Sequence, residues 1–326
     1  MDEVVKRPYA EEHAVTKGQT APLRASLRDI FPGYTKHTLF DREVYIMRWQ
    51  DRRRSSNVDD RRGRGGAGKG IMGGGIGLIV LIIFTLLGGN PADIIENTNI
   101  INPDANVPYV ETAEEREMAD FVSVVLADTE DVWTEVFEDY GYTYEKPTLV
   151  LFNGSVQSAC GVAGSSTGPF YCPGDHKLYI DLSFYGELRD RFKAPGDFAM
   201  AYVVAHEVGH HVQTRLGVTE KLNTLRHQLT PKEYNKYSVR FELQADYLAG
   251  VWANRVEGMG YLEEGDIEEA LTAANAIGDD RIQKQAQGYV VPDSFTHGTS
   301  EQRMKWFQKG YTLGNLDGWD TFNTSD

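Results

Sequence analysis

Two histidines and a glutamate near the middle of the chain have the spacing of a metal site. His206 and His210 are four residues apart, and on a helix such residues lie on the same face, so both imidazoles can bind one ion. Glu207 lies about 100° round that helix from His206, within reach of a metal-bound water but not itself a ligand. Zinc lowers the pKa of such a water towards ~7, and a neighbouring carboxylate can accept its proton. Residues 201–205 are apolar, which predicts a helix buried beneath a cleft.

A second stretch supplies the acidic groups that such a site needs. Thr230, Pro231 and Glu233 have the pattern of an N-cap, a proline at the first helical position and a capping box. On that helix Glu242 and Asp246 again lie four residues apart. A catalytic zinc takes three protein ligands, so Glu242 can complete a His2Glu set, and Asp246 can accept the second ring N–H of one histidine. Taken alone, the first stretch could be a core helix that carries two histidines, and the second could be a solvated acidic face. The two stretches together favour a metal site.

Two motifs carry a resemblance to a known family. The motif H-E-V-G-H-H-V-Q occupies residues 206–213, and E-L-Q-A-D-Y-L-A-G-V-W-A occupies residues 242–253. Together they resemble the bacterial neutral zinc metallopeptidase family, which is membrane-anchored and related to the gluzincin proteases. The similarity extends from Met47 to the C-terminus and includes residues 47–50, 160–161, 171–181 and 296–303. The resemblance implies a zincin-like fold and a peptidase reaction, but it implies no particular substrate.

The charge of the chain is divided unevenly. Residues 1–89 carry 15 basic and 10 acidic side chains, a net charge of +5, and residues 90–326 carry 18 basic and 38 acidic side chains, a net charge of −20. A strongly acidic main body repels phosphates, which argues against nucleic acid as a partner.

The N-terminal part of the chain is expected to anchor the protein in a membrane. Residues 71–88 carry no charged side chain, and about 18 residues at ~1.5 Å each span roughly 27 Å, enough to cross a bilayer. Seven basic residues lie between positions 51 and 70, and none lies between 89 and 115. The positive-inside rule therefore places the N-terminus in the cytoplasm and the main body outside. A buried core helix and a cleaved signal peptide are the alternatives.

These features predict five segments. Residues 1–46 have no helical or strand period and precede the resemblance, so they are interpreted as a gene-model extension or a disordered cytoplasmic tail. The other expected segments are a basic cytoplasmic segment (47–70), a transmembrane helix (71–88), a linker (89–110) and a zinc metallopeptidase domain (111–326).

The domain is expected to be α+β, with a small mixed sheet and a mainly helical C-terminal half. Thr112 to Glu115 form a capping box before apolar residues at helical spacing that continue to about Tyr140. Residues 146–153 are predicted to form a buried strand, and residues 170–182 a hairpin. The family resemblance implies that an extended peptide could add to the edge of this hairpin. N-caps at Asp266 and Thr299 predict two further helices.

Three further side chains receive functional interpretations. Cys160 and Cys172 are the only cysteines; two thiols would stay reduced in a cytosolic protein, but outside the membrane a disulfide is favoured. His297 or Tyr247 could donate to the oxyanion of a tetrahedral intermediate, and a histidine bonded to a loop carbonyl is the equal alternative for His297.

The sequence therefore predicts a membrane-anchored, zinc-dependent endopeptidase whose catalytic domain lies outside the cytoplasm. Zinc is expected on His206, His210 and Glu242, with Glu207 as the base and a polypeptide as the substrate. Two alternatives stay open. One is a zinc hydrolase of another amide, such as a cell-wall peptide, and the other is a non-catalytic membrane scaffold with a structural zinc.

Overall fold

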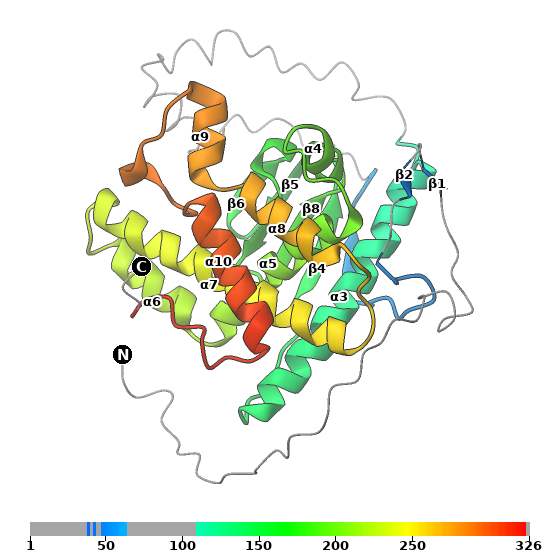
Figure 1. The fold of residues 1–326 in the computed structure, drawn as a ribbon, viewed down its shortest axis with the longest axis horizontal. Coiled ribbons are helices and arrows are strands. Elements are labelled where there is room, and N and C mark those ends of the chain that lie inside the picture. Colours follow the sequence, from blue (N-terminus) through cyan, green and yellow to red (C-terminus); the bar gives the residue numbers. More distant parts are fainter. Residues whose placement is uncertain (1–37, 40–41, 44–46, 64–108, 324–326) are drawn as a thin grey trace, which may run out of the picture. The chain divides into compact units, whose positions relative to one another are not determined.

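The computed structural model describes residues 38–39, 42–43, 47–63 and 109–323 (Figure 1). The chain forms two units, residues 1–44 and residues 45–326. In the first unit, β1 (Thr38–Leu39) and β2 (Arg42–Glu43) form an antiparallel pair. The other predictions for residues 1–46 and those for residues 64–108, including the apolar segment 71–88, fall outside the described residues. Within the described parts of the chain, no helix is long and apolar enough to cross a membrane.

A small mixed sheet forms one layer of the second unit, as predicted. Its strands lie in the order β3 (Val58–Asp60), β4 (Thr148–Phe152), β8 (Lys177–Asp181) and β7 (Phe170–Cys172). The pairs β3–β4 and β4–β8 are parallel, and β7 runs antiparallel to β8 as the hairpin predicted at residues 170–182. β7 is thus one edge of this sheet.

Both faces of the sheet are buried because apolar residues occupy successive positions of the central strands. Leu149, Leu151 and Ile180 face the main core with the helices. Val150 and Phe152 face a smaller core beneath the hairpin of β5 (Ser155–Ser158) and β6 (Gly161–Gly164). The predicted disulfide between Cys160 and Cys172 joins the turn of this hairpin to the edge strand β7, with Cα atoms 5.8 Å apart.

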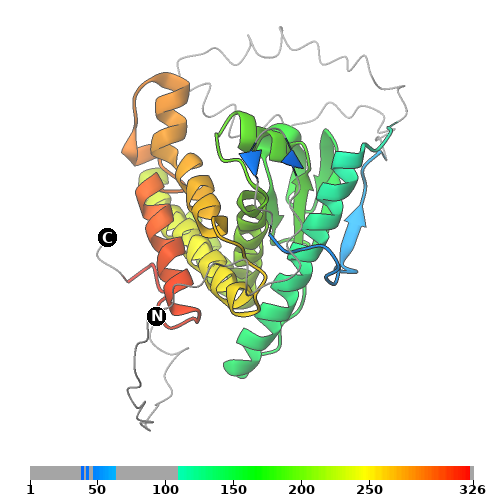
Figure 2. The ribbon, with the colours of Figure 1, turned by 45° about the vertical axis from the view of Figure 1, so that its right-hand side comes forward.

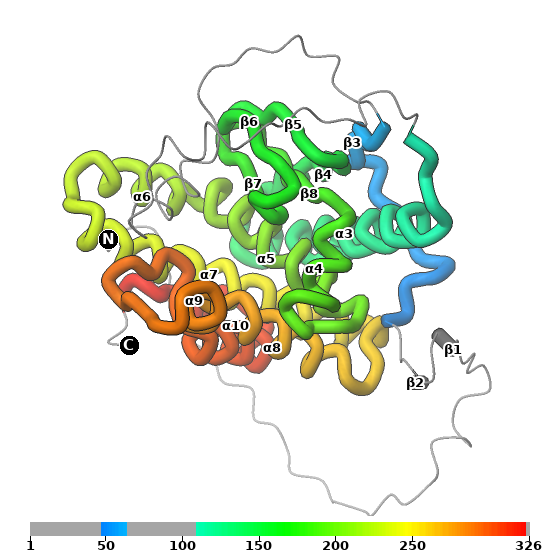
Figure 3. Tube along the Cα trace, turned by 90° about the horizontal axis from the view of Figure 1, so that it is seen from above, coloured from blue at the N-terminus to red at the C-terminus, as the bar shows by residue number. Residues whose placement is uncertain are grey.

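Helices form the rest of the unit. In chain order they are α3 (Ala113–Asp139), α4 (Phe184–Asp190), α5 (Asp197–Arg215), α6 (Val218–Arg226), α7 (Pro231–Gly258), α8 (Asp266–Ala276), α9 (Asp279–Gln287) and α10 (Ser300–Leu313). The capping boxes predicted at Thr112 and Thr230 and the N-cap predicted at Thr299 are present. Asp266, predicted as an N-cap, is instead the first residue of α8, and Gly265 is the N-cap. Seen from above, α3 and α5 lie along one face of the strands, and α7 and α10 lie beyond α5 (Figure 3). The buried α5 is therefore enclosed between the sheet and the C-terminal helices.

Residues 47–63 differ from the expectation of a basic cytoplasmic segment separate from the domain. Met47 and Trp49 are buried in the main core, and β3 pairs with β4 in the sheet. Figure 2 shows β3, in blue, beside α3. Two of the arginines that suggested a cytoplasmic flank are paired with acidic residues of α3: Arg53 lies 3.0 Å from Glu130, and Arg52 pairs with Asp128.

This packing brings described residues from both sides of the expected transmembrane segment into one sheet. A crossing at residues 71–88 would put β3 and β4 on opposite faces of a bilayer, whereas the structure pairs them in one sheet. Residues 47–63 belong to the same folded unit as residues 109–323, whereas the sequence indicated a separate segment for them. The membrane segment itself stays a prediction.

Candidate metal centre and cavity

The site is built where α5 and α7 cross at close range. Gly209 of α5 lies against Ala245 of α7, and a Cβ atom at Gly209 would lie 3.0 Å from the Ala245 carbonyl oxygen. This close approach brings His206 and His210 of α5 to Glu242 of α7. The potential ligand atoms of these three side chains all lie within 4.8 Å of one another.

The spacing of these atoms fits a zinc ion. Oε2 of Glu242 lies 3.2 Å from Nε2 of His206 and 3.5 Å from Nε2 of His210. Two ligands that each lie about 2.0–2.2 Å from a tetrahedral zinc are roughly 3.3–3.6 Å apart. Two imidazoles and one carboxylate are also a common donor set of catalytic zinc sites, which leave the fourth position open. The residues predicted as ligands therefore have both the chemistry and the spacing for zinc.

Asp246 orients His206, as its spacing from Glu242 suggested. Its Oδ1 lies 2.9 Å from Nδ1 of His206 and also accepts a 2.5 Å hydrogen bond from the Tyr202 hydroxyl. Arg303 of α10 donates to both oxygens of Asp246 at 2.9 and 3.0 Å. Burial works against the charged form of Asp246, but the positive charge of Arg303 and the contact with His206 lower its pKa to about 2. An ionised Asp246 keeps the proton of His206 on Nδ1, so Nε2 is free to bind a metal.

His210 has a comparable partner that sequence reasoning missed. Its Nδ1 lies 2.8 Å from Oε1 of Gln213, one turn later on α5. The amide group of Gln213 is fixed in turn, because its Nε2 donates to the Phe241 carbonyl at 2.7 Å and to Gln244 at 3.0 Å. The i, i+3 spacing of His210 and Gln213 was a usable signal, whereas the role of Arg303 needed the position of α10.

The three candidate metal ligands line a cavity of about 490 Å³. Glu207 lines this cavity beside His206, His210 and Glu242. Its remaining walls are largely apolar and include Phe170, Pro173, Phe184, Phe192, Val203, Leu222, Phe241, Ile277 and Ile282. A cleft above the α5 helix was expected from the sequence, and the structure places the predicted base within it.

His297 also reaches this cavity, from the loop before α10. Its Nδ1 lies 3.2 Å from Oδ1 of Asp279, whose other oxygen accepts the backbone N–H groups of residues 296–298. Partial desolvation disfavours the charged ring, but the negative charges of Glu242 and Asp279 outweigh it and raise the pKa of His297. The loop thus holds an imidazole that can act as a hydrogen-bond donor near the candidate metal ligands.

Two other candidates lie elsewhere. The hydroxyl of Tyr247 donates to the Asn315 carbonyl at 2.9 Å, and Tyr247 is not among the residues that line the cavity. His211 is buried and lies 2.6 Å from the Glu145 carbonyl and 3.0 Å from the Tyr171 hydroxyl. Burial lowers the pKa of His211 to about 4, so this ring is a neutral structural group. Tyr247 is therefore not available as the oxyanion donor.

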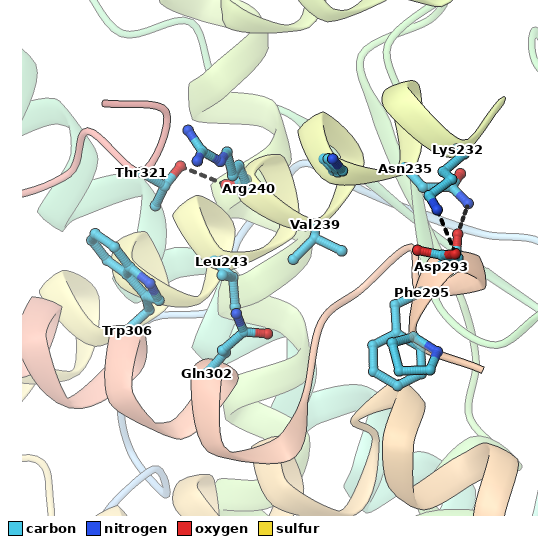
Figure 4. Close-up of a pocket in the computed structure, with 12 residues that line it drawn as sticks. Lys232, Asn235, Val239, Arg240, Leu243, Asp293, Phe295, Gln302, Trp306 and Thr321 are labelled. Atoms are coloured by element: carbon cyan, nitrogen blue, oxygen red, sulfur yellow. Dashed lines mark hydrogen bonds and ion pairs between the residues drawn. The ribbon is translucent and has the colours of Figure 1, made fainter. Parts of the chain in front are cut away.

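A smaller cavity of about 290 Å³ borders another face of α7 (Figure 4). Val239, Leu243, Phe295 and Trp306 contribute apolar walls, and the polar groups at its rim are paired with each other. Lys232 lies 2.7 Å from the carboxylate of Asp293, and Asn235 and Thr321 donate to backbone carbonyls. No metal ligand lines this cavity, which gives it no evident chemistry.

Comparisons with other proteins agree with the geometry of the metal centre. Residues 47–322 match the family described as "Putative neutral zinc metallopeptidase". The chain is 48% identical to the uncharacterized protein YpfJ of Escherichia coli K12 over 296 residues, covering 86% of this chain and 100% of YpfJ. It is 40% identical to the uncharacterized protein Mb2605 of Mycobacterium bovis over 255 residues, covering 74% of this chain and 85% of Mb2605. No solved structure matches. On the family match and these identities, the chain belongs to the neutral zinc metallopeptidase family.

Proposed function

We propose that this protein is a zinc-dependent endopeptidase that hydrolyses peptide bonds with water activated by Glu207. The observation that carries the proposal is the convergence of His206, His210 and Glu242 at the wall of a cavity that also contains Glu207. A structural zinc site is usually closed by four protein ligands. Three ligands beside an unused carboxylate and an open cavity favour catalysis over a purely structural role.

The residues divide the chemistry between them. When bound, zinc would supply Lewis acidity and lower the pKa of water at the site. Glu207 accepts a proton from the attacking water and delivers it to the leaving amine. Asp246 and Gln213 hold the ring protons of His206 and His210 on Nδ1. Both Nε2 atoms are thereby directed at Glu242 and the metal position.

The cavity supports a polypeptide as the substrate. β7 is an edge of the sheet and, in the described part of the chain, pairs only with β8. Phe170 and Tyr171 of β7 line the cavity itself. An extended peptide can add to such an edge through backbone hydrogen bonds. A peptide bound in this way would pass through the cavity and present one of its peptide bonds to Glu207. The apolar walls would then accept apolar side chains of the peptide.

Hydrolysis assays can separate a protease from a hydrolase of cell-wall peptides, which would use the same chemistry. The full chain, loaded with zinc, is incubated with casein and, in parallel, with purified cell-wall sacculi. New amino termini from casein support the endopeptidase proposal. Release of peptides from sacculi alone would assign the site to the cell wall instead.

His297 is proposed as the donor to the oxyanion of the tetrahedral intermediate. Its replacement by alanine is expected to lower kcat by about 10²–10³-fold, because one lost donor costs that much in comparable sites. Zinc content and KM should change little, since His297 is not one of the metal ligands. The exposed His227 provides the matched control, and its alanine variant should keep wild-type kcat. A wild-type kcat in His297→Ala would leave the alternative of a loop histidine held by Asp279.

The catalytic unit is proposed to lie outside the cytoplasm, because the disulfide between Cys160 and Cys172 needs an oxidising compartment. Cys172 is fully buried, so accessibility alone would protect it from a thiol reagent. Protein from native cells should therefore be denatured before labelling, and neither cysteine is expected to react until a reductant is added. Labelling of both cysteines without reductant would contradict this location.

A further inference from the structure

A second group of acidic side chains lies at the other end of α5, away from the cavity. Asp197 begins α5, and Asp266 and Glu269 lie in the first turn of α8. Their carboxylate oxygens lie within 4.8 Å of one another. Asp197 precedes His206 by nine residues, which is about 13 Å along a helix. None of the three lines the catalytic cavity.

Asp197 is the unusual member of this acidic cluster (Asp197, Asp266 and Glu269). Its side chain is deeply buried, the residue being 9% exposed, yet neither carboxylate oxygen has a hydrogen-bond partner among the described residues. The backbone amides at the start of α5 affect its pKa but do not reach hydrogen-bond geometry. A buried carboxylate without a partner is costly, so something other than the described protein groups is expected to satisfy it.

The carboxylates of Asp266 and Glu269 are held close to that of Asp197. Oδ2 of Asp266 accepts from the Glu263 N–H at 2.9 Å, and Oε2 of Glu269 accepts from the Phe198 N–H at 3.1 Å. These contacts fix both groups against the starts of the two helices. Gly196 makes room for this arrangement: its φ of +115° suits glycine, and a Cβ atom there would lie closer than 3.0 Å to the Glu269 carboxylate.

Among the described residues, no positive charge is seen to shift the pKa values of these three carboxyl groups. Burial raises the pKa of Asp197 well above its usual range, and Asp266 and Glu269 raise it further. Burial also raises the pKa values of Asp266 and Glu269 to about 7, and the charges that act on them are those of neighbouring carboxylates. At neutral pH, the negative charge of such a cluster is removed by bound protons or balanced by a bound cation.

We propose that the acidic cluster binds a divalent cation of the calcium type that links the start of α5 to α8. All its donors are oxygens, which hard cations prefer and which a zinc site seldom uses alone. Three carboxylates supply up to six oxygens, and calcium takes six to eight at flexible geometry. The ion satisfies the unpartnered Asp197 and fixes the N-terminal end of the helix that carries His206 and His210.

Terbium and calcium are suitable probes for this site. In the full chain loaded with zinc, Tb³⁺ should bind with sensitised luminescence, since Tyr185 lies close enough for Asp197 and Glu269 to act on its pKa. Calcium should displace the Tb³⁺ and, at constant zinc, raise the Tm by about 5 °C or more at saturation. Both responses should be lost in Asp197→Asn, which keeps the shape of the side chain.

Two further variants make the test decisive. Glu269→Gln should lose the same responses, and it replaces Asp197→Asn if that variant does not fold. Glu268→Gln, at an exposed position on the same helix, should respond like wild type. The proposal is overturned if calcium leaves the wild-type Tm unchanged and Asp197→Asn is more stable than wild type at pH 7. That result would show that the carboxyl groups hold protons.

Discussion

Replacement of Glu207 by glutamine is expected to reduce hydrolysis of a substrate polypeptide by at least 10²–10⁴-fold. Glutamine has nearly the same size but cannot accept a proton from water. The metal ligands His206, His210 and Glu242 are untouched, so one zinc per chain should remain. The measurement combines initial rates of peptide hydrolysis with metal analysis of the same samples.

This experiment needs a control at another glutamate and a stated result that would contradict it. Glu220 is an exposed glutamate on α6, and Glu220→Gln should hydrolyse the substrate at the wild-type rate. If cells that carry only Glu207→Gln behave like wild type, the protein acts as a scaffold and its zinc is structural. Loss of zinc in Glu207→Gln would instead mean that Glu207 supports the ligands rather than the reaction.

The metal centre depends on a buried ionic network that joins three helices. Asp246 of α7 receives hydrogen bonds from Tyr202 of α5 and from Arg303 of α10. Arg303 is 2% exposed and Asp246 fully buried. Removal of one partner from such a pair leaves an uncompensated charge and typically costs about 3–5 kcal/mol. The position of α10 is therefore coupled to the orientation of His206, although α10 supplies no metal ligand.

The candidate ligands could be named from the sequence because each pair of residues lies on a single helix. His206 with His210 and Glu242 with Asp246 are each set by one helical turn, and the helix that carries Glu242 is marked by its capping box at Thr230. Arg303 could not be assigned, because it lies 57 positions after Asp246 in the chain. The periodicity of a sequence does not predict which buried carboxylate an arginine on another helix will contact.

The role of residues 47–63 was missed for a related reason. A strand that pairs in parallel with a partner some 90 positions away carries no turn signal. Arg52 and Arg53 were interpreted as part of a charged flank because their acidic partners on α3 are about as distant along the chain. Composition describes the charges of a segment, but pairing decides whether they are solvated or neutralised within the fold.

Two glycines let α7 and α10 touch through their backbones. A Cβ atom at Gly250 of α7 would lie closer than 3.0 Å to the Phe307 carbonyl oxygen, and one at Gly310 of α10 would lie closer than 3.0 Å to the Tyr247 carbonyl oxygen. These neighbours are backbone atoms within helices, so they cannot rotate away as a side chain could. A methyl group at either position must push the two helices apart.

Gly310→Ala is therefore expected to destabilise the protein by about 3 kcal/mol or more, at the upper end of overpacking costs, despite the better helix propensity of alanine. Arg303 lies two turns earlier on α10, so separation of the helices should also weaken its contact with Asp246 and reduce zinc affinity. Denaturant unfolding at constant zinc measures the stability, and competition with a chelator measures the affinity. Gly258→Ala is the control on α7, because a Cβ atom there meets nothing within 4 Å. It should leave stability unchanged or raise it by roughly 0.5–1 kcal/mol. Equal unfolding midpoints for Gly310→Ala and Gly258→Ala would show that the close crossing of α7 and α10 does not hold this fold together.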